Sequence, residues 1–470
     1  MSESASPKNA LIYGVDDTPP WGQTLGLGLQ HYLTMFGSTV AIPLILAKPL
    51  GIADAPQSIA LLIGTIFVAS GLATLLQTSR LGNRLPIVQG GTFSFLSPAI
   101  AICSLPSLAQ QPWQLRMRHV QGAVISGSAV EILLGYSGLV GRLVRLIGPI
   151  SIAPTIALIG LSLFKVGAPV AGKHWGIGAL TISLIIVCSQ LLRRVHRAFE
   201  LFPIVLSIGG AWLVAALLSA LGVFGADHPA YTSLSNLKAT PWVRLPYPLQ
   251  WGMPVFSVAA TTAMLAGYLA SMVESIGDYY ACARLSGAPL PTRRTINRGI
   301  GTEGIGCLIA GLLGTGNGTT SYSENIGAIG LTRVGSRRVV QVGALLMIAL
   351  GTVGKFGAVF TTIPQPIVGG MYCAMFGIIA AVGLSNLQYV DLNSPRNLFI
   401  LGFAFFMGLS LPQYFATNPL RFEPQWAADL LNTLGSTGMA VGALISMVLD
   451  NVIPGSASER GHDAWHAAER

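Results

Sequence analysis

The sequence predicts an all-α polytopic membrane protein with fourteen transmembrane segments, arranged as an inverted repeat of seven plus seven. Charged residues make up only 10% of the 470 residues, whereas a soluble chain carries about 25%. Hydrophobic residues make up 52%, and the mean hydropathy is +0.63. Apolar runs recur along the chain at the length that a membrane-spanning helix needs. These observations exclude an ordinary soluble globule, a disordered chain and a coiled coil.

The apolar runs fall into two sets of seven, separated by a polar stretch at 226–250. The segments of the first half are 24–47, 58–78, 86–104, 119–138, 146–164, 174–192 and 201–222. Those of the second half are 254–281, 297–313, 315–332, 337–355, 362–384, 396–411 and 430–449. The segment 396–411 is short, so it either spans the membrane or lies in its interface.

The positive charges indicate the orientation. The net charge is +9, and the basic residues are scattered between apolar segments, without the aromatic-rich patch of a nucleic-acid site. If the N-terminus lies inside, the inside loops carry more arginine and lysine than the outside loops, as the positive-inside rule requires. An odd number of segments in each half gives the two halves opposite orientations, which is the plan of many secondary transporters.

The third and tenth segments are poor in helix formers. Residues 89–98 read QGGTFSFLSP and residues 314–325 read GTGNGTTSYSEN. We expect each to be a short extended stretch that leads into a half-helix near the middle of the membrane. Irregular backbone at that depth is tolerated only where it is buried in protein or lines a watery cavity. Matching breaks in both halves are the best sequence indication of a binding site.

Charged residues inside a span are costly and usually functional. Glu274 and Asp278 are four residues apart and share one helical face. Glu324 opens the second half-helix, and His31 lies inside the first segment. These groups could bind a cation, exchange a proton or hydrogen-bond a polar ring, and the residues alone leave the three roles open.

Two further acids lie within spans. Glu303 follows Arg294 and Arg298, so a structural or gating ion pair is as good an interpretation as a transport role. For Glu131, in the fourth segment, we expect a structural role.

The sequence carries no sign of an enzyme or of a bound cofactor. It has no H-E-x-x-H, G-x-S-x-G or Walker motif, which argues against a membrane hydrolase or an ATP-driven pump. Its five cysteines have no C-x-x-C spacing, so we interpret them as small core residues. The first 20 residues lack an apolar stretch, so we expect no cleaved signal peptide.

The segment 324–333 reads ENIGAIGLTR and resembles the signature of the nucleobase–ascorbate transporter family at every fixed position. That signature is Gln, Glu or Pro, then Asn, any residue, Gly, four residues of any kind, Thr, and Arg, Lys or Gly. The pair Gln30-His31 and the block from Glu274 to Tyr280 are also similar to the family pattern. The resemblance runs from about Trp21 to Ser456.

The resemblance implies a core domain that moves like an elevator against a gate domain, in a homodimer. Segments 1–4 and 8–11 would form the core, and segments 5–7 and 12–14 the gate and the dimer interface. The boundaries that follow are 1–20 for an N-terminal cytoplasmic tail, 21–138 and 251–356 for the core, 139–225 and 357–450 for the gate, 226–250 for an extracellular loop and 451–470 for a C-terminal cytoplasmic tail.

The resemblance also implies a substrate site. Glu274 and Glu324 would hydrogen-bond the substrate, and Phe93 would stack on or flank its ring. Backbone groups near Thr92, Phe93 and Ser323 would complete the site.

Other residues of the pattern would act around that site. Asn325 would brace it, Thr332 and Arg333 would influence specificity or gating, and His31 and Asp278 would be the ion-linked pair, with sodium near them.

The first position of the signature bears on the substrate. Members that resemble ascorbate carriers have Pro there, whereas this chain has Glu324, whose carboxylate suits the N–H groups of a nucleobase. Residues 383–391 and 450–456 look like the animal, sodium-coupled branch. We therefore expect a sodium-driven symporter for a purine or uracil in the plasma membrane. Proton coupling is the close alternative, and ascorbate is the rival substrate.

Overall fold

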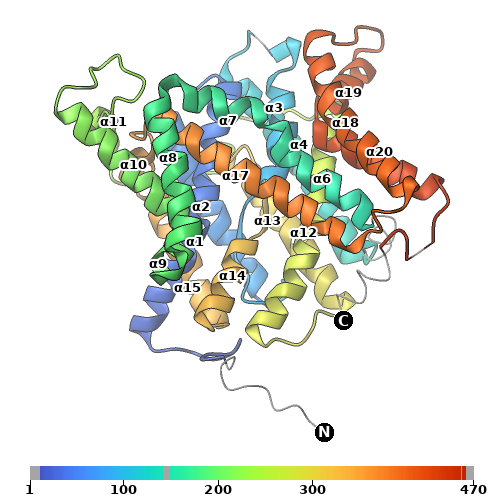
Figure 1. The fold of residues 1–470 in the computed structure, drawn as a ribbon, viewed down its shortest axis with the longest axis horizontal. Helices are drawn as coiled ribbons and strands as arrows, with labels where there is room; N and C mark the ends of the chain where they lie inside the picture. Colours follow the sequence, from blue (N-terminus) through green and yellow to red (C-terminus); the bar gives the residue numbers. More distant parts are fainter. Residues whose placement is uncertain (1–10, 109, 141–147, 457, 462–470) are drawn as a thin grey trace.

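The computed structural model describes residues 11–108, 110–140, 148–456 and 458–461. The chain is predominantly helical, and helices follow one another from end to end (Figure 1). The helices of the first half are α1 (Trp21–Leu50), α2 (Pro56–Thr78), α3 (Leu96–Cys103), α4 (Trp113–Ser137), α6 (Pro149–Ser162), α7 (Phe164–Ala171), α8 (Trp175–Ile186), α9 (Arg197–Leu201), α10 (Pro203–Ala220) and α11 (Ser235–Ala239).

The second half has the same character. Its helices are α12 (Val258–Ser286), α13 (Arg293–Leu313), α14 (Ser323–Thr332), α15 (Arg337–Thr352), α16 (Gly354–Phe360), α17 (Gln365–Ser385), α18 (Pro395–Thr417), α19 (Gln425–Gly435) and α20 (Gly438–Val452). Two strands, β1 (Gln89–Gly91) and β2 (Thr319–Ser321), interrupt the helices. Short 3₁₀ turns lie at Phe93–Phe95, Pro106–Leu108, Gly172–His174, Leu192–Arg194 and Asn386–Tyr389, and α8 continues into a π-helical turn at Val187–Leu191.

The extended stretches predicted in the third and tenth segments are present, and they pair with each other. Strands β1 and β2 are antiparallel, with Gln89 opposite Ser321 and Gly91 opposite Thr319. Beyond the strands, the side-chain amide of Asn317 replaces a strand partner. It accepts from the backbone N–H of Thr92 at 2.9 Å and donates to the Thr92 carbonyl at 3.0 Å. The irregular backbone therefore has its hydrogen bonds inside the protein, as its depth demands.

The helices pack in two groups. In the first, which we call the α13 group, α4 and α2 lie along α13, α12 packs against α4 and α14, and α15 lies along α1 and α2. In the second, the α17 group, α6, α7 and α8 lie along α17, and α18 and α20 pack with α6. Figure 1 shows α18, α19 and α20 at one edge of the molecule and α10 and α11 at the opposite edge.

Glycines allow these helices to approach closely, which is the usual packing device in membranes. A β-carbon on Gly64 of α2 would lie 2.5 Å from the carbonyl oxygen of Gly351 on α15. A β-carbon on Gly135 of α4 would lie 2.3 Å from the backbone nitrogen of Gly301 on α13. No side chain fits at either crossing, so the two contacts fix the spacing within the α13 group.

Several segments differ from the sequence-based expectation. Among the described residues, six helices are long and apolar enough to span a membrane, or seven if the bent pair of α19 and α20 is one span. The predicted segment 430–449 breaks between these two helices, which meet at 88°. The predicted segment 146–164 ends at Ser162, and a separate helix α7 follows. The segment 396–411 belongs to α18, which has 23 residues and is long enough to span. The polar stretch 226–250 contains the short helix α11.

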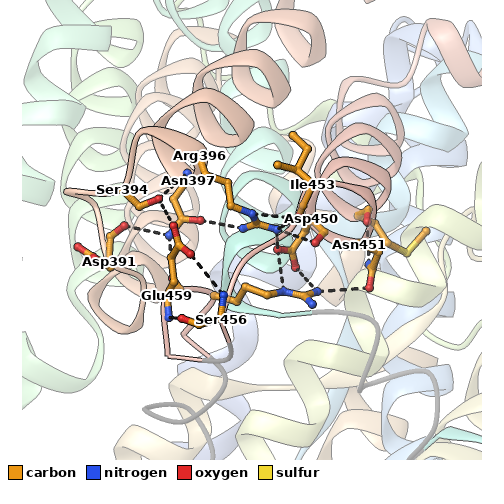
Figure 2. Close-up of polar contacts among 11 residues, drawn as sticks. Asp391, Ser394, Arg396, Asn397, Asp450, Asn451, Ile453, Ser456 and Glu459 are labelled. Atoms are coloured by element: carbon orange, nitrogen blue, oxygen red, sulfur yellow. Dashed lines mark hydrogen bonds and ion pairs between the residues drawn. The ribbon is translucent and has the colours of Figure 1, made fainter.

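Figure 2 shows a polar cluster where the start of α18 meets the end of α20. We call it the Asp450 cluster, after a carboxylate that is only 1% exposed. Asp450 Oδ1 accepts from Arg396 Nη2 at 2.9 Å, and Asp450 Oδ2 accepts from Arg460 Nη2 at 3.0 Å. Asn397 donates to the Glu459 carbonyl at 2.7 Å, and the Ser394 hydroxyl donates to the Glu459 carboxylate. These bonds tie residues 459–460 to the α17 group.

Candidate functional site

A cavity of about 340 Å³ lies where β1, β2, α12 and α14 face α6, α10 and α17. Five of the residues predicted to bind a substrate line it: Thr92, Phe93, Glu274, Ser323 and Glu324. Thr92 and Phe93 lie more than 200 residues before Ser323 and Glu324, and the pairing of β1 with β2 brings these two stretches together. Glu274 reaches the cavity from α12. A second cavity of about 260 Å³ adjoins the first, since Ser38, Pro203, Ile204 and Glu324 line both.

Two carboxyl groups dominate the polar side of the cavity. Glu274 comes from the middle of α12, and Glu324 lies in the first turn of α14. The hydroxyl of Ser38 on α1 donates to Glu324 Oε1 at 3.3 Å. Within the described residues neither acid forms an ion pair. Both carboxylates therefore face the cavity as hydrogen-bond acceptors.

The aromatic ring of Phe93 belongs to the turn between β1 and α3. It meets Phe376 of α17 edge to face, with 6.2 Å between the ring centroids. The neighbouring Thr92 side chain accepts from the backbone N–H of Ser94 at 3.1 Å, which holds the turn closed. Phe93 thus lines the cavity from a turn with its own hydrogen bonds.

The opposite wall of the cavity is apolar. It consists of side chains from α6, α10 and α17, namely Ile156, Ile159, Pro203, Ile204, Met375, Ile378, Ile379 and Val382. Every charged residue that lines the cavity therefore belongs to the α13 group or to the two half-helices and strands packed in it.

His31 and Asp278 do not touch each other, but α14 links them. Asn325 Nδ2 donates to the His31 carbonyl at 2.8 Å and lies 3.1 Å from His31 Nδ1. The Ser323 hydroxyl donates to Asp278 Oδ1 at 2.7 Å. The second oxygen of Asp278 is buried and has no hydrogen-bond partner among the described residues. The first turn of α14 thus contacts the cavity, His31 and Asp278 at once.

Comparison with known proteins assigns the family. A family model described as a permease family matches residues 22–417. The chain belongs to the nucleobase–ascorbate transporter family. Solute carrier family 23 member 1 from Rattus norvegicus is 47% identical over 506 residues, which cover 98% of this chain and 84% of that protein. Nucleobase-ascorbate transporter 1 from Arabidopsis thaliana is 41% identical over 480 residues, which cover 97% of this chain and 92% of that protein.

The fold also has relatives among solved structures. The transmembrane domain of the cyanobacterial bicarbonate transporter BicA superposes with a TM-score of 0.54, at 14% identity, over 92% of this chain and 99% of that one. At this identity the likeness concerns the fold alone. The family relationship makes this chain a multi-pass membrane transporter and not an enzyme.

The end of the family signature lies away from the cavity lining. Thr332 is the last residue of α14, and its hydroxyl donates to the Ala328 carbonyl at 2.8 Å. Arg333 caps the helix in the left-handed conformation, with φ of 58°, and its carbonyl accepts from the backbone N–H of Ile12 at 2.8 Å. These two residues shape the join between α14 and the N-terminal segment.

Ser38 was missed by the sequence analysis. It follows His31 by about two helical turns and so lies on the same face of α1, which was a usable signal.

Of the two interpretations of Glu303, the ion pair with Arg294 or Arg298 is not present among the described residues. Glu303 instead accepts from the hydroxyl of Ser275 at 2.7 Å and from that of Tyr279 at 3.1 Å. Both donors lie on α12, so a guess from sequence neighbours on α13 could not find them.

The described residues contain no group of three or more His, Cys, Asp or Glu side chains that could hold a metal ion.

Proposed function

We propose that this transporter is a secondary active symporter that carries a nucleobase, a purine or uracil, into the cell with sodium. The observation that carries the proposal is the polar wall of the cavity, where Glu274 and Glu324 have no cationic partner among the residues that the structure describes. A carboxylate accepts two N–H donors from the amide edge of a heterocycle, and hydrogen bonds to charged groups are the stronger kind. The ring of Phe93 offers an apolar face for a flat base.

In this proposal backbone groups near Thr92, Phe93 and Ser323 complete the site, although those of Thr92 itself are bonded to Asn317. Asn325 braces the site through His31. A free half-helix N-terminus at α14 adds N–H donors for a ring carbonyl. A nucleobase has both N–H and carbonyl groups on one edge, so it matches a site that has both acceptors and donors.

Sodium would bind near His31 and Asp278. The support is the position of Asp278, whose free oxygen lies beside the half-helix that also lines the cavity. Occupation of an ion site there would order the first turn of α14 and thereby the substrate site. Proton exchange at Asp278 is the alternative, and it uses the same contact with Ser323.

The proposal includes an elevator-like movement of a core domain against a gate domain, with fourteen segments in a 7+7 inverted repeat. It is supported by the two unequal walls of the cavity, because all charged contacts would move with the α13 group along an apolar surface. We also propose a homodimer in the plasma membrane that joins through segments 5–7 and 12–14, with Thr332 and Arg333 acting on specificity or gating.

The proposal is tested by thermal unfolding of the purified protein with uracil, xanthine, hypoxanthine, guanine, adenine and ascorbate, each with sodium and with choline in its place. A ligand that binds the folded state raises its apparent stability. We expect stabilisation by at least one nucleobase that requires sodium. If a nucleobase stabilises the protein equally with sodium and with choline, the coupling ion is the proton and not sodium. Stabilisation by ascorbate alone would overturn the nucleobase assignment.

A further inference from the structure

A second group of buried acids lies behind the paired strands, away from the cavity lining. Glu131 on α4 and Glu303 on α13 are 0% and 1% exposed. They lie where the two helices pack closely, since a β-carbon on Gly304 would come within 2.8 Å of the Ile132 nitrogen and 3.2 Å of the Ser128 oxygen. The two carboxyl groups are close enough for their charges, if both were ionised, to interact across this contact.

The two acids have opposite surroundings. Glu303 accepts from Ser275 at 2.7 Å and from Tyr279 at 3.1 Å, with the Ser321 hydroxyl at 3.5 Å, which is the environment of an ionised carboxylate. Both oxygens of Glu131 lack a hydrogen-bond partner among the described residues. The Cys307 thiol faces Glu131, but a thiol is a weak donor, and Cys307 also contacts the Thr319 carbonyl at 3.2 Å.

The polar groups around the pair offer more hydrogen-bond acceptors than donors. The amide of Gln77 donates to Tyr279 at 2.8 Å, and that of Gln89 donates to Ser321 at 3.0 Å, so both amides are joined to the donors of Glu303. The carbonyl oxygens of these two amides are buried and have no partner within the described chain. The hydrogen-bond donors of the network are therefore engaged, while several of its acceptor oxygens have no partner in the described residues. A buried site with unpaired acceptors can satisfy them by binding a cation or a proton.

Among the described residues, the other titratable groups that face the pair are Cys307 on α13, Tyr268 and Tyr279 on α12, and two further acids of α12, Glu274 and Asp278. Thiols and phenols are neutral in their ordinary range at pH 7. Neither acid of the pair has an ion-pair partner in the described residues. Two negative charges at this depth would therefore stand without compensation, and one proton is the smallest ligand that removes the second charge.

We propose that Glu131 and Glu303 form a proton-binding pair, in which Glu131 holds one proton and Glu303 is the carboxylate. The O–H of Glu131 supplies the donor that the network lacks. The pair is joined to the transport cavity, because Ser321 of β2 lines that cavity and its backbone N–H donates to the Ser275 hydroxyl at 3.3 Å. The site is separate from the contact between Asp278 and Ser323, and the proposal does not depend on the identity of the substrate.

Infrared spectroscopy of the purified protein, without substrate, tests this directly. A protonated carboxylic acid has a carbonyl band apart from that of carboxylates, and we expect Glu131→Gln to remove one such band at neutral pH. Glu303→Gln should keep the band and change its position, because a neutral amide replaces the neighbouring carboxylate. Asp54→Asn, which changes an exposed acid in the turn between α1 and α2, is the matched control and should leave the spectrum unchanged.

The result that overturns the proposal is a Glu131→Gln spectrum that retains every protonated-acid band of the parent protein. A band that appears only when sodium is replaced by choline would also overturn it, since sodium would then be the occupant of the pair. If Glu131→Gln does not yield folded protein, the same question is decided on the parent protein. Raising the pH must then remove one band, and Glu303→Gln must move that band.

Discussion

Two buried aspartates show two uses of a charge in this protein. Asp450 lies between Arg396 and Arg460 and accepts hydrogen bonds from both. Asp278 has one serine hydroxyl as its partner, and its other oxygen has none within the described residues. A carboxylate that two fixed cations neutralise has no reason to bind anything further. One that has no cationic partner among the described residues remains available for a ligand, an ion or a proton, although its burial costs stability.

The same contrast separates the two groups of helices. In the α13 group the acids Glu274, Glu303 and Glu324 meet hydroxyls and backbone groups or face the cavity. In the α17 group the described cavity wall is apolar, and its buried acid is paired at the end of α20. We therefore expect charge in the first group to serve transport and charge in the second to serve stability.

The largest expected effect is on stability. Arg396→Ala removes one of the two cations beside Asp450 and two hydrogen bonds to the Ile453 carbonyl. Breaking a buried pair costs about 3–5 kcal/mol. We expect a lower unfolding temperature with unchanged substrate affinity in the protein that remains folded. Arg193→Ala, at an exposed arginine, is the control. Equal stability of the two variants would end the structural interpretation of the cluster.

The next effect is on binding. Glu324→Gln keeps the shape of the side chain and removes its charge. The loss of a charged hydrogen bond, about 1.5–3 kcal/mol, corresponds to a loss of affinity of about 10- to 100-fold. The unfolding temperature without ligand should stay the same. Isothermal titration calorimetry with the stabilising nucleobase measures the affinity. Glu200→Gln, in the adjoining cavity, is the control. Unchanged affinity in the folded variant would remove Glu324 from the site.

A smaller effect on binding, with a clear effect on coupling, is expected for Asp278→Asn. The amide oxygen still accepts from Ser323, so the first turn of α14 keeps its contact. The variant has no charge for an ion and no proton to exchange. Proteoliposomes should therefore bind the substrate without accumulating it against a gradient. Normal ion-driven accumulation, as expected for the control Asp54→Asn, would refute the coupling role.

The smallest effect is expected at the rim of the Asp450 cluster. Glu459→Gln weakens the contact with Ser394 but keeps the bond from Asn397, which goes to the Glu459 carbonyl. Partly exposed charged contacts contribute about 0–1 kcal/mol. Thermal unfolding should therefore show a far smaller change than Arg396→Ala. If Glu459→Gln lowered the unfolding temperature as much as Arg396→Ala, the contacts of Glu459 would contribute as much stability as the ion pairs of Asp450.

The sequence was most informative where polar or small residues interrupt an apolar membrane segment. Gly, Ser and Thr in a membrane segment cannot be explained by hydrophobic burial, so residues 89–98 and 314–325 revealed the strands and half-helices. The acids were found for the same reason. The apolar wall of the cavity, with Ile159 and Met375, was not predictable, because every face of a membrane helix is apolar. The bend between α19 and α20 was also hidden, since hydropathy gives the length of a run but not its direction.

The pairing of β1 with β2 has a consequence for how the protein is made. Gln89 and Ser321 are 232 residues apart, so Gln89 leaves the ribosome long before its partner exists. At a synthesis rate of about 5–20 residues per second, the delay is roughly 10–50 s. Throughout that time the peptide groups of residues 89–91 lie in or near a membrane without their strand partner. The third segment therefore cannot reach its final structure until the second half has been made. A cell that makes this protein needs a factor, such as the insertion machinery, that keeps these unpaired peptide groups away from lipid until then.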